Sequence, residues 1–360
     1  MKSFLFPGQG SQHVGMGEGL FDAFPELTAA ADAILGYSIR ELCLHDAARQ
    51  LTLTQFTQPA LYVVNALTAR RKQQEGQQPD FVAGHSLGEY NALECAGVFG
   101  FEDGLRLVQK RGALMAQAAP GGMAAIIGID AAKVAEVLAN AGLSTIDVAN
   151  YNQATQTVIS GLREEVTGAQ AAFEAAGAMF IPLNVGGAFH SRYMQPAATE
   201  FERFLQGFRF AAPRVPVIAN VTGKPHEDGR IAETLARQLT HSVRWADSMH
   251  YLLQQGVTEF VEAGPRDVLT KMIRGIRSQW KPQPAAAAAA VAEPPRAALP
   301  ATDVVAAWNR NHPVGTRVSA RGYEQPIATR TPAMVLFGHR AAVYLQGYNG
   351  YFALEDLRPV

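Results

Sequence analysis

The feature that most constrains this chain is a serine between two glycines at the boundary of two apolar segments. Residues 84–88 read GHSLG, after a short apolar segment at residues 80–83 and before a helix-forming segment at residues 89–96. In the G-x-S-x-G pattern a sharp turn from strand to helix projects the serine, and small residues relieve the crowding around it. The pattern predicts a strand, a turn and a helix, with Ser86 as a candidate nucleophile. A glycine-rich turn without chemistry is the alternative.

Apolar runs elsewhere predict the other strands of the same layer. Residues 4–6, 215–218 and 259–263 have the character of buried parallel strands. The stretches between them carry helical periodicity, as at residues 105–115. Strands that alternate with helices are typical of an α/β fold. We therefore expect an α/β-hydrolase-like large domain with a parallel sheet.

Residues 123–187 carry a different order of predicted elements, β-α-β-β-α-β, which is that of the ferredoxin-like unit. Glycine pairs at both ends, at residues 121–122 and 186–187, would let the chain leave and re-enter the larger domain. We expect an inserted ferredoxin-like subdomain at 123–187, within a core of residues 1–122 and 188–280. Its six elements are expected at residues 123–129, 134–138, 144–150, 157–160, 166–173 and 179–183.

The composition changes abruptly at residues 281–302, where prolines bracket a run of alanines. We interpret this segment as a linker, and a short alanine helix is the competing interpretation. Residues 303–360 then carry short strand signals and an Asn349-Gly350 pair that is favoured in hairpins. We expect a small β-barrel-like domain there. Its strands are predicted at residues 316–318, 334–337, 342–345 and 351–354.

The overall composition excludes several classes of protein. A chain of 360 residues with 48% apolar content can bury a large core, and a net charge of -1 gives no bias toward nucleic acid or anionic membranes. The apolar start meets a Pro-Gly turn at once, so no signal peptide or membrane span is expected. Cys43 and Cys95 lack metal-ligand spacing and are expected to be buried free thiols. A cytoplasmic monomer without a metal fits these observations.

A serine hydroxyl is a weak nucleophile, so a base must lie close to Ser86. The sequence offers nine histidines. His85 adjoins the serine, but adjacent side chains on such a turn point apart. His190 follows a strand and a glycine pair, where an active-site loop is expected, although an ordinary loop histidine would fit the same pattern. The other histidines, His226 among them, lie in polar settings that look exposed.

Five motifs, taken together and in order, resemble malonyl-CoA:acyl-carrier-protein transacylases over about the first 280 residues. They are FPGQGSQ at residues 6–12 with GMG at 15–17, GHSLGE at 84–89, Arg111-Gly112 with Met115, FHS at 189–191, and Gln238 ahead of VRW at 243–245. The resemblance implies that Ser86 is the nucleophile and His190 its base. It also implies that the main-chain carbonyl of Gln238 orients the imidazole.

The same resemblance assigns the remaining site residues. The backbone N–H groups of Gln9 and Leu87 would hold the tetrahedral oxyanion. Arg111 would bind the free carboxylate of a malonyl group through its planar fork, and a solvated helix arginine is the alternative. Met115 and Phe189 would contact the substrate. The sequence GAFH at residues 187–190 is close to the His-Ala-Phe-His pattern of malonyl-selective polyketide synthase acyltransferases, in which a bulky aromatic crowds out a methyl branch. Together with NYN at residues 150–152, SRYM at residues 191–194 and the tail after residue 303, this loop resembles the free-standing, trans-acting members of the family.

The expected activity is transfer of malonyl from malonyl-CoA, through an ester on Ser86, to the phosphopantetheine thiol of an acyl carrier protein. The pathway would be polyketide or fatty-acid synthesis, and no cofactor is required. An editing hydrolase of the same fold is the first alternative, although Arg111 argues against it because such an enzyme accepts uncharged chains. The second alternative is a docking module that acts through the C-terminal domain, where Tyr344, Tyr348 and Tyr351 look exposed. The same tyrosines could equally form the core of a hairpin.

Overall fold

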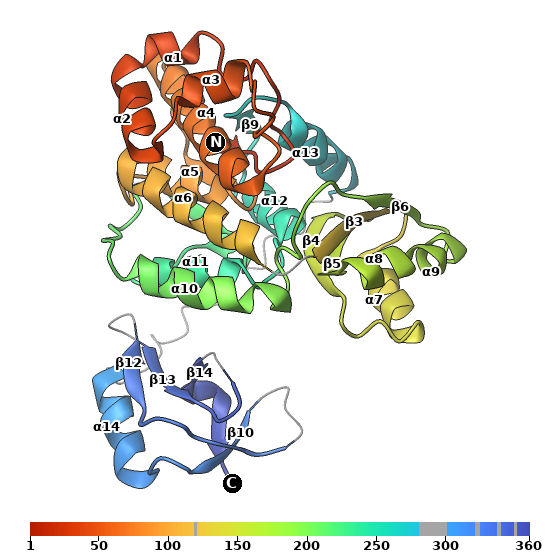
Figure 1. Ribbon diagram of the computed structural model, residues 1–360, viewed down its shortest axis with the longest axis vertical. Coiled ribbons are helices and arrows are strands. Elements are labelled where there is room, and N and C mark those ends of the chain that lie inside the picture. Colours follow the sequence, from red (N-terminus) through yellow and green to blue (C-terminus); the bar gives the residue numbers. More distant parts are fainter. Residues whose placement is uncertain (119–120, 281–300, 321–324, 337–339, 349–350) are drawn as a thin grey trace. The chain divides into compact units, whose positions relative to one another are not determined.

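The computed structural model describes residues 1–118, 121–280, 301–320, 325–336, 340–348 and 351–360. The chain divides into two compact units, Met1–Pro282 and Gln283–Val360. The predicted linker therefore lies outside the described residues except for its last two positions. Figure 1 colours the first unit from red to blue-green and the second in blue. In these described ranges, no helix combines the length and the apolar character that crossing a bilayer requires.

The first unit is built around a five-stranded sheet with the order β8-β7-β2-β1-β9. All neighbours pair in parallel except β7 and β8, which are antiparallel. The parallel sheet predicted from the apolar runs is thus confirmed, whereas the two-residue edge strand β8 is too short to leave a signal in the sequence. The strands are β1 (Lys2–Phe6), β2 (Phe81–Gly84), β7 (Val217–Ala219), β8 (Lys224–Pro225) and β9 (Glu259–Glu262).

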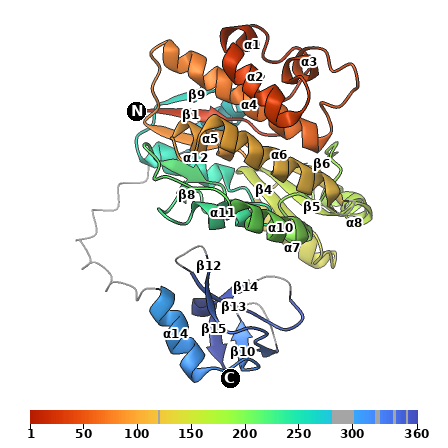
Figure 2. The ribbon, with the colours of Figure 1, turned by 60° about the vertical axis from the view of Figure 1, so that its left-hand side comes forward.

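Helices cover both faces of this sheet, because alternate side chains of a strand point to opposite faces. Phe4 and Phe6 of β1 pack in the cluster that includes α4, α5 and α6, whereas Leu5 packs with α12 and α13. The two layers can be followed in Figure 2. The helices of the unit outside the inserted subdomain are α1 (Leu20–Ala23), α2 (Pro25–Leu35), α3 (Ile39–Leu44), α4 (Thr54–Gln74), α5 (Gly88–Cys95), α6 (Phe101–Gln117), α10 (Gln195–Leu205), α11 (Ile231–Gln238), α12 (Trp245–Gln254) and α13 (Val268–Gln279).

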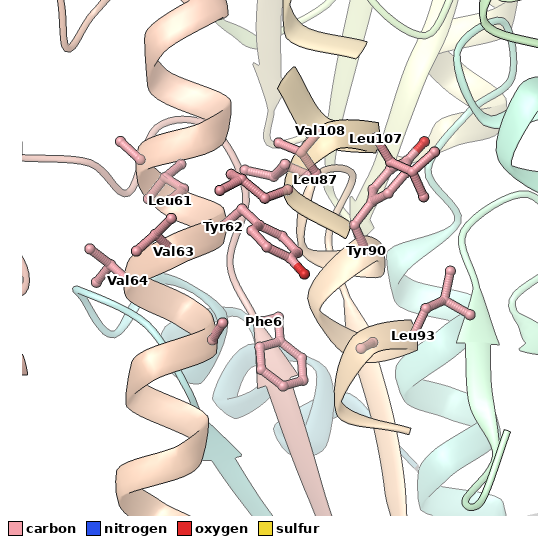
Figure 3. Close-up of a cluster of buried hydrophobic side chains, with 14 of the residues drawn as sticks. Phe6, Leu61, Tyr62, Val63, Val64, Leu87, Tyr90, Leu93, Leu107 and Val108 are labelled. Atoms are coloured by element: carbon pink, nitrogen blue, oxygen red, sulfur yellow. The ribbon is translucent and has the colours of Figure 1, made fainter. Parts of the chain in front are cut away.

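The larger core cluster encloses the start of α5. Figure 3 shows Leu87 and Tyr90 among side chains from β1, α4 and α6. Leu87 is only 1% exposed, and Tyr62 and Tyr90 are fully buried. Close packing of this kind leaves a side chain little freedom to move. The backbone that follows β2 is therefore anchored by the core on which it lies.

The inserted segment folds into a four-stranded antiparallel sheet with the order β4-β5-β3-β6 and its own apolar core. This is the order that a β-α-β-β-α-β unit of ferredoxin-like type adopts, so that prediction is confirmed (Figure 1). The second helix differs from the prediction because it is divided at Gly168, a poor helix former. The elements are β3 (Gly121–Ile127), α7 (Ala131–Asn140), β4 (Asp147–Gln153), β5 (Gln156–Leu162), α8 (Arg163–Gly168), α9 (Gln170–Ala175) and β6 (Met179–Pro182).

Hydrogen bonds attach the inserted sheet to the segment that leads into α12. The Tyr151 N–H donates to the Val243 carbonyl at 2.9 Å, and the Val243 N–H donates to the Ala149 carbonyl at 2.8 Å. The Ser242 hydroxyl also donates to the Val148 carbonyl at 2.5 Å. These bonds extend the pairing of β4 into the larger domain and attach the inserted sheet to it.

The second unit contains two three-stranded antiparallel sheets, β11-β10-β15 and β12-β13-β14. The expectation of strands alone is wrong at its start, where α14 forms and packs against β12 and β13. The β-branched and aromatic residues Val304, Val305 and Trp308 of α14 mask its helical character in the sequence, and they pack on the core of this unit. The predicted Asn349-Gly350 turn lies outside the described residues. The elements are α14 (Ala301–Asn311), β10 (Arg317–Ala320), β11 (Ile327–Ala328), β12 (Met334–Leu336), β13 (Arg340–Tyr344), β14 (Tyr351–Ala353) and β15 (Leu357–Pro359).

Candidate active site

Ser86 lies in a sharp turn between β2 and α5, as the sequence pattern predicts. Its φ is 52°, which is in the left-handed region that side chains other than glycine rarely adopt. The flanking glycines are required by the close approach of the backbone. A Cβ at Gly84 would lie 1.9 Å from the backbone of Gly88, and a Cβ at Gly88 would lie 2.0 Å from the carbonyl oxygen of Phe6. The turn therefore stores strain at the serine and cannot accept larger flanking residues.

Asn220, which follows β7, fixes the two ends of this turn. Its Oδ1 accepts the Ser86 N–H at 2.6 Å, and its Nδ2 donates to the Gly84 carbonyl at 2.7 Å. The side chain is buried and lies 134 positions from Ser86 in the sequence. Sequence analysis missed Asn220 because nothing near it in the chain indicates contact with the turn.

The structure brings together Ser86, His190 and Gln238, which were all predicted site residues. The Ser86 Oγ lies 2.7 Å from the His190 Nε2, and the His190 Nδ1 lies 2.8 Å from the main-chain oxygen of Gln238. A carbonyl oxygen can only accept, so Nδ1 carries the proton and donates it. Nε2 is then the acceptor for the Ser86 hydroxyl. This is the tautomer that a general base acting on the serine must have.

The environment keeps His190 in its neutral form. Burial, together with the positive charge of Arg111, lowers the pKa of His190 to about 3. His85, the neighbour of the serine, is directed elsewhere: its Nε2 lies 2.9 Å from Asn152 Oδ1, and its ring packs against Trp245. Burial also lowers the pKa of His85. The expectation that His85 points away from Ser86 is confirmed.

Arg111 of α6 is fully buried and faces the same cavity as Ser86. Its Nη1 donates to Gln58 Oε1 at 2.7 Å. Its Nη2 donates to the side-chain Oε1 of Gln238 at 3.0 Å and to the Ser86 Oγ at 3.1 Å. The interpretation of Arg111 as a solvated helix arginine is therefore wrong. The guanidinium is held by neutral acceptors, which leaves its charge available to an anion that enters the cavity.

A small pocket of about 90 Å³ opens beside Ser86, and most of the predicted site residues line it. The apolar side includes Met115 and Phe189, and the Met115 Sδ accepts from the Gln58 amide at 3.3 Å. Gln238 lies behind His190 and Arg111 and does not line the pocket. The lining residues are Gln9, Gln58, His85, Ser86, Leu87, Arg111, Met115, Met123, Asn150, Leu183, Val185, Phe189 and His190.

Gln9 and Leu87 both line the pocket beside Ser86, and Leu87 directly follows Ser86 at the start of α5. The carbonyl of His85 would clash at 2.4 Å with a Cβ at Gly8, so the loop that carries Gln9 requires glycine to come this close. Among the described residues, no main-chain or side-chain acceptor receives the N–H of Gln9 or Leu87. N–H groups without an acceptor can donate to an oxygen on which negative charge develops, and so stabilise it.

Two further site residues, Glu89 and His226, were missed. The expectation that His226 is exposed is wrong, because its side chain is buried and its Nε2 lies 2.7 Å from Glu89 Oε1. Glu89 in turn accepts from Gln238 Nε2 at 2.5 Å. The presence of Glu89 in the motif GHSLGE is the only indication of either residue in the sequence. In the ranges that the structure covers, no three His, Cys, Asp or Glu side chains are grouped so that they could hold a metal ion.

Comparison with known proteins decides the family. The sequence model of the acyl transferase domain matches residues 3–324, which is most of the chain. This chain belongs to the acyl transferase domain family. A polyketide biosynthesis malonyl CoA-acyl carrier protein transacylase, BaeC of Bacillus velezensis, is 54% identical over 288 residues, which are 79% of this acyltransferase and 100% of that relative.

Solved structures of similar acyltransferases support the same family. A malonyl CoA-acyl carrier protein transacylase from Burkholderia pseudomallei has 50% sequence identity and a TM-score of 0.76, over 78% of this chain and 99% of that one. A malonyl-transacylase in complex with its type II PKS acyl-carrier protein has 37% identity and a TM-score of 0.74, over 77% of this chain and 93% of that one. The α/β fold of the acyltransferase is therefore shared with enzymes whose structures are solved.

Proposed function

We propose that this acyltransferase transfers malonyl from malonyl-CoA to the phosphopantetheine thiol of an acyl carrier protein through an ester on Ser86. The observation that carries the proposal is the buried Arg111, held by neutral acceptors and hydrogen-bonded to the Ser86 hydroxyl. A guanidinium fork can hold a carboxylate in two parallel hydrogen bonds, which an acetyl or longer acyl group cannot supply. Relatives named as malonyl transacylases support the same substrate.

The first half of the reaction forms the acyl-enzyme. The Ser86 Oγ attacks the thioester carbonyl of malonyl-CoA while the His190 Nε2 takes its proton. The carbonyl oxygen becomes an oxyanion, for which the N–H groups of Gln9 and Leu87 are the proposed donors. When the C–S bond breaks, the imidazolium returns the proton to the sulfur, so coenzyme A leaves as a thiol. The Gln238 carbonyl stabilises the imidazolium and holds its orientation.

The second half repeats these steps with a different thiol. His190 takes the proton of the phosphopantetheine thiol, whose sulfur attacks the Ser86 ester. The C–O bond breaks, the proton passes to Ser86 Oγ, and the malonyl thioester leaves on the carrier protein. Water could replace the thiol, which is the reaction of an editing hydrolase. No additional base is required for either half, because one imidazole accepts and returns the proton each time.

We propose that the enzyme acts in polyketide biosynthesis. The similar BaeC protein is named as a polyketide biosynthesis enzyme, and the solved complex pairs a malonyl-transacylase with a type II PKS acyl-carrier protein. These relatives support a free-standing enzyme that loads polyketide carrier proteins. We further propose a monomer in the cytoplasm. Its two cysteines, Cys43 and Cys95, are both free thiols, which fits a reducing compartment.

An intact-mass measurement tests the proposal. The protein is mixed with malonyl-CoA or acetyl-CoA and then offered a phosphopantetheinylated acyl carrier protein. A malonyl adduct that persists until the carrier protein is added, and then moves to it, is the expected result. Rapid loss of the acyl group to water with either donor would instead identify an editing hydrolase. Absence of any adduct would contradict acyl transfer through Ser86.

The neutral state of His190 predicts an unusual pH dependence. A base is lost as the pH falls through its pKa, and the pKa of His190 is held at about 3 by burial and by Arg111. The single-turnover rate of Ser86 loading should therefore show no acid limb near about pH 6.5, the ordinary value for histidine. Stopped-flow loading at stepped pH values measures this rate. A loss of rate centred near the ordinary histidine pKa would show that His190 is not held neutral.

Phe189→Ser should relax the rejection of methylmalonyl-CoA. Phe189 is buried and lines the apolar side of the pocket, so its ring crowds a methyl branch on the second carbon of the acyl group. The ratio of methylmalonyl to malonyl loading should rise by roughly tenfold or more. Competition between the two donors, read by intact mass, gives this ratio. Phe204→Ser in α10 is the matched control, and an unchanged ratio in the Phe189 variant would place the selectivity elsewhere.

A further inference from the structure

The charge of Arg111 has no direct acidic partner in the described part of the chain. Its guanidinium donates hydrogen bonds to the amide oxygens of Gln58 and Gln238 and to the hydroxyl of Ser86. The next group beyond Gln238 is the carboxylate of Glu89, which accepts from the same amide at 2.5 Å. One amide thus separates a fully buried cation from a fully buried carboxylate.

The hydrogen bonds of the Gln238 side chain define the orientation of its amide group. Its Nε2 donates to Glu89 Oε2 and to the Ser86 carbonyl, which lies 2.9 Å away. Both of these groups can only accept, so the amide nitrogen must face them. The amide oxygen is then left to accept from Arg111 Nη2. The opposite orientation would place the NH₂ group of the amide against the guanidinium, and two donors cannot form a hydrogen bond with each other.

His226 donates a hydrogen bond to Glu89 without neutralising its negative charge. The His226 Nε2 donates to Glu89 Oε1, while its Nδ1 is buried and meets no hydrogen-bond partner among the described residues. A protonated imidazole would carry a second N–H at Nδ1, and a buried N–H without an acceptor is costly. The arrangement therefore fits a neutral histidine that donates one hydrogen bond. Glu89 keeps a negative charge that His226 does not cancel.

We propose that Glu89 is a positioning residue that serves as the displaced counter-charge of Arg111, acting through the side chain of Gln238. A carboxylate in direct contact would occupy the guanidinium fork and compete with the substrate. A carboxylate one amide away compensates the buried cation before the substrate arrives and leaves the fork open. The inference rests on the proposed function only for the identity of the incoming anion, because the coupling of Glu89 to Arg111 is a property of the free enzyme.

A double-mutant cycle between Glu89→Gln and Arg111→Met tests the coupling without any substrate. Glutamine has the size of glutamate, and its amide oxygen can still accept from Gln238 Nε2. Its NH₂ group faces His226 with and without Arg111, so any cost of that contact is common to both backgrounds and cancels in the cycle. Glu89→Gln should lower Tm by roughly 5 °C, because it strips a buried cation of its compensation. In the Arg111→Met background the same change should cost far less. An equal drop in both backgrounds would overturn the proposal.

Glu94→Gln is the matched control on the same helix. Glu94 is a buried carboxylate that pairs with Arg70 at 2.5 Å, away from the pocket. Its loss should lower Tm equally with and without Arg111. If Glu89→Gln does not fold, the double variant Glu89→Gln/Arg111→Met distinguishes the two explanations. A folded double variant would support the coupling. A double variant that also fails to fold would contradict it, because Glu89 would then be required independently of Arg111.

A second measurement connects the counter-charge to the substrate. Malonyl loading should raise the Tm of Glu89→Gln by more than it raises that of the wild type, because the substrate carboxylate replaces the missing charge. Acetyl loading should give no such additional gain. Equal gains with malonyl and acetyl would overturn the proposed role of Glu89. A wild-type enzyme that malonyl-CoA does not load would instead contradict the proposed function, while the substrate-free cycle would still report on the coupling.

Discussion

Ser86→Ala should abolish the covalent malonyl adduct and with it all transfer to the carrier protein. The Ser86 Oγ is the atom that lies 2.7 Å from the base and 3.1 Å from the Arg111 guanidinium. An alanine has no atom that could form the ester, and the loading rate should fall by a factor of at least about 10³. Intact mass after mixing with malonyl-CoA measures the adduct directly. The variant should still fold, since the hydroxyl is not part of the bonds that Asn220 makes to the turn.

Ser160→Ala provides the matched control. Ser160 is a buried serine of β5 whose hydroxyl has no hydrogen-bond partner among the described residues. Its loss should leave the adduct unchanged. A normal malonyl mass shift in Ser86→Ala would remove Ser86 as the nucleophile and would direct the search to another side chain. Loss of the adduct in both variants would point to a general loss of structure.

The turn at Ser86 could be predicted from sequence because its causes are local. The glycines at positions 84 and 88 are needed wherever a strand meets a helix at so short a distance, and the structure shows the close approaches that require them. The strands could be predicted for a similar reason, because a buried parallel strand is apolar on both faces. The order of motifs then led to His190 and Gln238, which local patterns alone left open.

The second layer of the site could not be predicted in the same way. Glu89 and His226 meet across 137 positions of the chain, and Asn220 reaches Ser86 across 134. His226 stands beside Glu227 and Asp228, and its polar neighbours indicate a surface loop. The burial of His226 depends on its contact with Glu89 of α5, which in turn bonds Gln238 of α11, and no run of adjacent residues contains these contacts. The helix α14 was missed for a different reason, since its β-branched residues favour strands.

Arg111→Met should convert a malonyl-selective enzyme into one that no longer distinguishes malonyl from acetyl. Methionine fills much of the same space without a charge, so the pocket keeps its shape while the proposed anion partner is removed. The malonyl carboxylate would then enter a buried site with no cation, at a cost of a few kcal/mol. Malonyl loading should fall by about 10² to 10³, whereas acetyl loading should change much less. Single-turnover loading with each donor gives the two rates.

Lys110→Ala separates the effect of this one guanidinium from that of positive charge on α6 in general. Lys110 is the preceding residue on the helix, but its ammonium is part of an ion pair with Glu200 and lies above the ring of Phe204, outside the pocket beside Ser86. Exposed pairs of this kind contribute about 1 kcal/mol or less, so malonyl selectivity should be unchanged. Because Arg111 also donates to Ser86 Oγ, its loss will slow both donors to some extent. The test is therefore the ratio of the malonyl loading rate to the acetyl loading rate. An equal fall in both rates would show that Arg111 only positions Ser86 and does not select the malonyl carboxylate.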